Sequence, residues 1–140
     1  MEFQSIRQLQ RVAGLEESAT AADIHEAVTI AHGTRSVDVA AAFCDAMESV
    51  GGLGGLRAIF DGGGAQELLQ LMSVFRGSPE VVTPACKTIA FLCNGPAERR
   101  SALAAAGAEL LLQHALEAGV AGKDAFGKDW AALALKKLRA

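Results

Sequence analysis

Several features that mark other protein classes are scarce or missing in this sequence. Tyrosine is absent, aromatic residues make up only 5% of the chain, and proline occurs three times. Few β-branched residues beside much Ala and Leu argue against a sheet protein. No run approaches the length of about 18 apolar residues that a membrane-spanning helix needs. The N-terminal stretch MEFQSIRQLQR also lacks the apolar core of a signal peptide. We therefore expect neither a sheet protein nor insertion into a membrane.

Strong charge and paired cysteines are missing as well. The net charge of −3 is too small and too acidic for a dedicated nucleic-acid binder, so we expect no nucleic-acid partner. Cys44, Cys86 and Cys93 form an odd set without close pairs, which is not a disulfide framework. We expect them to be small buried hydrophobes. Free thiols indicate a reducing, intracellular compartment, in the first place the cytoplasm, with the nucleus open as an alternative.

Alanine and glycine are what the chain has in abundance. It contains 28 Ala and 15 Gly among 140 residues, a length that fits one globular domain spanning residues 1–140. Alanine favours helices and lets them approach closely, whereas glycine often ends them. The composition therefore predicts an all-α fold of many short, tightly packed helices.

A repeat of 42 to 46 residues runs along the chain. Gly64-Ala65 aligns with Gly107-Ala108 at an offset of 43, and Cys44 aligns with Cys86 at an offset of 42. This period lies in the range of helical solenoids, in which stacked units bury one continuous core. The approximate units are residues 1–50, 51–94 and 95–140.

Each unit is expected to contain a short helix, a second helix and a longer third helix. The short helices are predicted over residues 6–12, 53–60 and 97–106. The second helices should end at glycines in the C′ position, namely Gly33, Gly77 and Gly119. The third helices should begin at Ser36, at Ser78-Pro79, and near Lys123 or Asp124. They are expected to end at Val50, at Asn94 and at the C-terminus.

The middle of the chain carries a family pattern. The block Gly64-Ala-Gln-Glu-Leu-Leu-Gln-Leu-Met72, the segment Ser78-Pro-Glu-Val-Val82 and the segment Ile89-Ala-Phe-Leu-Cys-Asn94 together resemble an armadillo repeat. Leu92-Cys93-Asn94 fits the Leu-x-Asn-like ending of the family's third helix. The resemblance covers residues 51–118 by pattern, and residues 20–50 and 123–140 by spacing. The related HEAT arrangement is the structural competitor, and the extra short helix favours armadillo.

The resemblance implies a right-handed solenoid of about three three-helix repeats. In that family the third helices line a groove that binds partner proteins. Peptide-binding members carry a Trp four residues before the Asn, whereas Ala90 stands at that place here. This departure argues against an extended-peptide ladder of the nuclear-import type. The resemblance implies instead a protein-interaction scaffold that binds a protein or peptide partner along its third helices.

Candidate groove residues follow from the repeat. Lys87 and Asn94 are seven apart on one predicted helix, and Thr83 begins the adjoining row. Transferring these positions through the repeat offsets completes the candidate protein-binding set: Asp45, Glu48, Thr83, Lys87, Asn94, Asp129 and Lys136. A solvated polar face without a partner is the alternative interpretation, and Asn94 could simply cap its helix. Trp130 is expected to pack in the core in one stripe with Phe126, or to anchor an interface.

Two further expectations concern the ends of the solenoid and the chemistry of the chain. The ends of a three-unit solenoid are open, so self-assembly through the ends, possible homo-oligomers, or a fragment of a longer solenoid is the alternative function. An enzyme is not expected, because no acid, base or nucleophile pattern is visible. We expect no cofactor or metal, because His25 and His32 would lie about 10 Å apart along one helix.

Overall fold

The structure, a computed structural model, describes residues 2–140, and these residues form helices joined by turns. The first helices are α1 (Glu2–Leu15), the 3-10 turn η1 (Glu16–Ser18), α2 (Ala21–Ala31) and α3 (Val37–Gly52). Then follow α4 (Leu56–Asp61), α5 (Gly64–Val74), α6 (Pro79–Leu92), α7 (Ala97–Ala105), α8 (Ala108–Ala118) and α9 (Trp130–Leu138). No strand lies in this described part of the chain, so the prediction of an all-α fold is confirmed.

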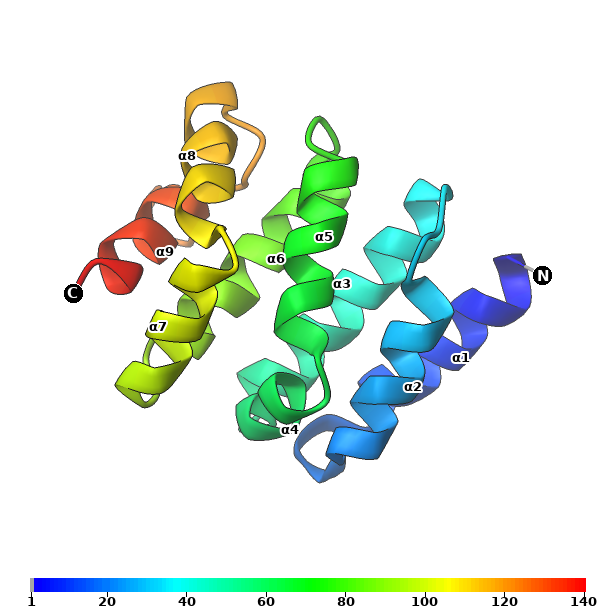
Figure 1. Cartoon of the computed structure of the whole chain (residues 1–140). Helices are drawn as coiled ribbons and strands as arrows, with labels where there is room; N and C mark the ends of the chain where they lie inside the picture. Colours follow the sequence, from blue (N-terminus) through cyan, green and yellow to red (C-terminus); the bar gives the residue numbers. More distant parts are fainter. Residues whose placement is uncertain (1) are drawn as a thin grey trace.

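The helices form two layers (Figure 1). In one layer α1, α3, α6 and α9 lie side by side in chain order, and each packs against the next. In the other layer α2, α5 and α8 follow the same order, with α4 and α7 beside their lower ends in this view. No helix formed by residues 2–140 is both long and apolar enough to cross a membrane.

One core fills the space between the layers. Its largest fully buried side chains include Phe43 and Met47 of α3, Leu68 of α5 and Ile89 of α6. Burial of such a side chain contributes about 1.5–3 kcal/mol to folding, so the apolar stripes of the helices are what hold the two layers together. The three cysteines are buried in the same core and are free, as the sequence predicted.

Most helix starts follow from local sequence. The side chain of Ser36 accepts a hydrogen bond from the Val39 amide and caps α3, and Pro79 occupies the first position of α6 behind Ser78. The offset of 42 between these starts is therefore confirmed. Thr20 forms a capping box with Asp23 at the start of α2.

The glycine alignment needs a correction of one residue. Gly63 and Gly107 both immediately precede a helix and both have left-handed backbone, with φ of 85° and 88°. The structural offset between the second and third units is thus 44 at this turn, because Gly63, and not Gly64, matches Gly107. Gly33 and Gly119 have positive φ as expected of C′ glycines, whereas Gly77 does not, because α5 already ends at Val74.

Both ends of the chain depart from the predicted pattern. The first helix is longer than residues 6–12 and packs along α3, since it buries Leu9 and Val12, so it extends the α3–α6–α9 layer instead of opening a unit. The last helix begins at Trp130 and not near Lys123, because Asp124 and Asp129 bind nearby backbone amides and hold residues 122–129 in a loop. Phe126 is consequently 88% exposed and shares no stripe with Trp130.

Two helix bounds also shift within the chain. The short helix predicted over residues 53–60 begins only at Leu56, because the chain first turns at Gly54, where φ is 102°. The helix α6 ends at Leu92, so Asn94 lies two residues beyond it in the turn. In the preceding unit the third helix is longer than predicted, because α3 continues past Val50 through the buried Gly51 to Gly52.

Candidate functional site

The predicted groove residues fall on or near the open side of one layer. We use the name α3–α6–α9 face for this surface, which carries Asp45, Glu48, Lys87, Phe91, Asn94, Trp130 and Lys137. The face exists because α3, α6 and α9 each turn one stripe to the core and to their neighbours in the layer. The remaining stripe of each helix is left uncovered.

Lys87 is the centre of this face. Its Nζ lies 3.3 Å from Glu48 Oε2 on α3, and the two side chains are 32% and 34% exposed. The same Nζ lies 5.4 Å from the centre of the Trp130 ring on α9, a cation–π distance. Phe91, one turn along α6, meets Trp130 edge-on with ring centres 6.3 Å apart. One cation thus connects an acidic helix to an aromatic pair across three helices.

Asp45 lies next to this cluster. It is one turn before Glu48 on α3, and its pKa is raised by partial burial and then by the charge of Glu48. Two carboxylates at this spacing repel each other. Of these two carboxylates, Lys87 forms a hydrogen bond only with that of Glu48. The α3 side of the face therefore carries negative charge that Lys87 offsets only in part.

Asn94 joins the face through a contact that the sequence did not indicate. Lys137 Nζ on α9 donates a hydrogen bond of 2.6 Å to Asn94 Oδ1, so this amide bridges the turn after α6 to α9. Lys136, the predicted residue, lies elsewhere: it lines a hollow at the C-terminal end together with Leu116 and Leu135. Adjacent residues on a helix point about 100° apart, which separates the two lysines.

Two of the predicted groove residues, Thr83 and Asp129, form hydrogen bonds within the fold. Thr83 Oγ1 accepts a hydrogen bond from the Gly122 amide at 2.9 Å and donates to Val120 O at 3.4 Å. Asp129 caps α9, because its carboxylate accepts from the amides of Ala131 and Ala132. These contacts fix the loop before α9 and thereby position Trp130 against Lys87.

The other layer has a hydrogen-bonded pair that sequence reasoning missed. His32, just after α2, places Nδ1 2.9 Å from Glu67 Oε1 on α5. Glu67 is only 4% exposed and its Oε2 has no hydrogen-bond partner among the described residues, whereas the His32 side chain is 70% exposed. We call the packing of α2 against α5 the first join, and His32 and Glu67 close it at one end.

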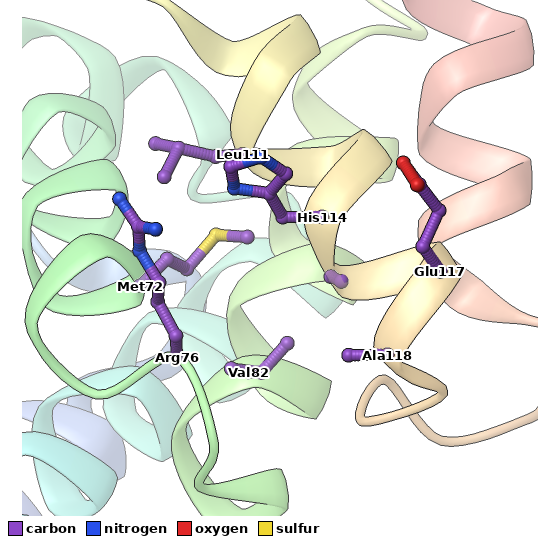
Figure 2. A pocket seen from close by; sticks show the side chains of 8 residues that line it. Met72, Arg76, Val82, Leu111, His114, Glu117 and Ala118 are labelled. Atoms are coloured by element: carbon purple, nitrogen blue, oxygen red, sulfur yellow. The ribbon is translucent and has the colours of Figure 1, made fainter.

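The packing of α5 against α8, which we call the second join, is open. A cavity of about 380 Å³ lies there, lined by Met72, Arg76, Val82, Leu111, His114, Ala115, Glu117 and Ala118. Figure 2 shows that Arg76 extends toward the side of Leu111 and His114, whereas Glu117 lies on the opposite side of the view. A second hollow shares Leu111 with this cavity, and a third hollow shares Gln66, Leu69 and Ala106 with the second. We name this continuous surface the α5–α8 groove.

All three cysteine thiols lie in surroundings that disfavour their ionised form. Burial raises the pKa of Cys44 and of Cys93, and it raises the pKa of Cys86 to about 12, so these thiols stay protonated at neutral pH. Among residues 2–140, no three side chains of His, Cys, Asp or Glu gather closely enough to hold a metal ion.

Comparison with protein-family models, with curated proteins and with solved structures finds no match to this chain.

Proposed function

We propose that this chain is a non-enzymatic scaffold that binds a protein or peptide along the α3–α6–α9 face. The observation that carries the proposal is the position of Lys87 between Glu48 and Trp130, which links three helices on one uncovered surface. Aromatic and charged groups that are only partly buried are typical of residues that anchor a partner. The proposal includes an armadillo-like solenoid, which the chain-order packing within each layer supports.

The chemistry of the face indicates what a partner offers. A basic side chain would compensate Asp45, whose charge Lys87 leaves unpaired. An apolar side chain would cover the Phe91–Trp130 pair. The free cysteines support an intracellular site of action, because thiols stay unpaired where the compartment is reducing.

A display experiment tests the proposal. A library of random peptides is selected on the full chain, and the affinities of the enriched peptides are measured for the parent and for Lys87→Glu. We expect basic, apolar peptides whose affinity falls about tenfold in Lys87→Glu, since the reversal removes the Trp130 contact and repels Glu48. The matched control is Lys128→Glu, in the exposed loop before α9. Peptides that bind parent and Lys87→Glu equally would move the site elsewhere.

One observation favours self-assembly as a second candidate. The C-terminal end has a hollow of about 590 Å³ with Leu116 and Leu135 in its lining, where no further helix of the described chain packs. A second copy could cover this apolar surface. Light scattering across a concentration series tests the idea: a dimer lost in Leu116→Glu would support it, and a monomer at high concentration would exclude it.

A further inference from the structure

The α5–α8 groove is a line of three hollows. The first lies between Phe60, Leu69 and Leu103 and measures about 290 Å³. The second, of about 380 Å³, lies over Leu69 and Leu111 beside Gln66, Gln70 and Ser73. The third is the cavity of Figure 2, with Met72, Val82 and Leu111 in its lining. The groove is therefore apolar at its base and carries uncharged polar groups along its α5 edge.

The hollows follow one another at the rise of a helix. Along α5 and the turn after it, their linings advance from Ala65, Gln66 and Leu69 to Gln66, Leu69, Gln70 and Ser73, and then to Met72 and Arg76. The two steps are about three and about four to five residues, so they average about one turn, or about 5.4 Å, close to the spacing of side chains at i, i+4 and i+7 on a helix. A groove between two helices with this spacing matches the apolar face of a third helix.

The first join shows what the second join lacks. The buried positions Ile24 and Ala27 of α2 recur at Leu68 and Leu71 of α5, an offset of 44 that carries His32 to Arg76. The same offset carries Glu67 of α5 to Leu111 of α8. A basic side chain after the helix is thus present in both joins, but the carboxyl group that meets it in the first join is replaced by a leucine in the second. Arg76 extends beside Leu111 at the cavity, without any carboxylate partner among the described residues (Figure 2).

We propose that the α5–α8 groove binds an amphipathic helix of a partner protein, whose apolar face fills the three hollows and whose carboxylate pairs with Arg76. The partner's acidic residue takes the place that Glu67 has in the first join. An Arg–carboxylate pair adds both energy and orientation, because the guanidinium donates two parallel hydrogen bonds to the carboxylate. The acidic end of the bound helix lies at the Arg76 end of the groove, beside His114. This site is separate from the α3–α6–α9 face, which lies on the other layer.

Synthetic peptides test the proposal directly. The acidic probe is a helix-forming peptide of about 15 residues. It has leucines at i, i+4 and i+7 and two glutamates after the last leucine. The basic probe has two lysines in place of the glutamates. Fluorescence anisotropy with the full chain gives both affinities, and we expect the acidic probe to bind about tenfold more tightly than the basic one. Equal binding of the two probes would overturn the assignment.

Variants locate the binding in the groove. Arg76→Glu should weaken binding of the acidic probe about tenfold and should not weaken binding of the basic probe. Arg35→Glu, at another exposed arginine, is the matched control and should change neither. Leu111→Glu supplies the missing carboxylate from the chain itself and should abolish binding of the acidic probe. Leu110→Glu, at the neighbouring residue that is 64% exposed, should not. An acidic probe that binds Arg76→Glu or Leu111→Glu as it binds the parent would refute the proposal.

Two measurements guard against misleading results. Circular dichroism checks that Leu111→Glu keeps the parent's helicity, and if it does not, the methyl NMR signals of Met72 and Leu69 in the parent decide, because the acidic probe must shift them. Light scattering without peptide tests the other occupant. If the parent is a dimer and the Leu111→Glu variant is a monomer, a second copy fills the groove, and the proposal would fail. Lys87→Glu should not change binding of the acidic probe, so this result is independent of the α3–α6–α9 face.

Discussion

The first and second joins use equivalent helices but pack them differently. In the first join, the turn before α5 lies directly against α2. A Cβ atom at Gly62 would be 2.6 Å from Ala21 O and from Ile24 Cβ, and one at Gly64 would be 3.1 Å from Ile24 Cγ2. In the second join, Ala106 and Ala108 stand at these positions, and Ala106 lines the groove. Accordingly α4 packs against α2, whereas the main neighbours of α7 are α8 and α9.

This difference shows how a repeat can produce one closed and one open contact between neighbouring helices of the same layer. Two missing methyl groups allow the close approach, and the His32–Glu67 pair then fits across it. Where the methyl groups are present and the carboxylate is a leucine, a groove remains. The substitutions below test how far each of these residues accounts for the contrast.

The largest effect is expected from Gly62→Ala, which should break the first join. The added methyl group meets the backbone oxygen of Ala21, which cannot move without shifting α2. We expect a loss of about 3 kcal/mol in the free energy of unfolding, the upper range for overpacking. Urea denaturation measures it. Gly14→Ala on α1, where the new methyl group meets open space, should instead stabilise slightly. A Gly62→Ala protein as stable as the parent would show that the approach is not tight.

A smaller loss is expected when the pair in the first join is removed. His32→Ala leaves the buried Glu67 with neither of its oxygens bonded, and we expect a cost of about 2 kcal/mol. The double variant His32→Ala/Glu67→Leu copies the residue of the second join and should recover most of this loss, because the buried charge is gone. Thermal denaturation of the parent, the single and the double variant measures both. If the double variant is no better than the single one, the charge of Glu67 is not the cause.

The buried thiols make the free energy of unfolding depend on pH. Burial raises the pKa of the Cys44 thiol, and Glu67 of the first join raises it further. Cys86 ionises at a pKa of about 12 when folded and at its ordinary value of 9.0 when unfolded. Above pH 9.0 the unfolded chain therefore binds fewer protons than the folded chain. The free energy of unfolding consequently falls as the pH rises from 9.0 to about 12. The slope should be about 1.4 kcal/mol per pH unit for each of these thiols. Urea titrations at several pH values measure it, and Cys86→Ala should show a flatter dependence. A slope unchanged in Cys86→Ala would contradict the assignment.

The smallest effect is expected on the opposite layer, at Lys87→Met. This variant removes the Glu48 pair and the Trp130 contact, and each is partly exposed, so we expect a loss below about 1 kcal/mol. Both joins should keep their structure, which NMR spectra of the methyl groups of Ile24 and Leu111 would show. A larger loss would mean that the α3–α6–α9 face holds the fold together instead of offering a surface to a partner.

The helices could largely be predicted because their ends depend on local chemistry. Ser36, Ser78-Pro79, Gly33 and Gly119 mark helix ends in the structure as they do in the sequence. The last helix was predicted wrongly, since Asp124 binds amides within the loop and Asp129 caps a helix that begins only at Trp130, neither of which a helical pattern reveals. At the site, Glu48 and Lys87 were predicted and do meet, whereas Lys137 replaces Lys136 because one residue turns the side chain by about 100°.

The sequence by itself determined the helical class, the repeat and most of the helix ends. Caps and periodicity involve residues no more than about four apart, so the chain carries them locally. Only the tertiary structure decided that the first join closes and the second stays open. It also decided that Glu67 meets His32 and that Arg76 meets no carboxylate among residues 2–140. These outcomes depend on distances between side chains 35 or more residues apart, and differences of a single methyl group change them, because packed interiors have no spare volume.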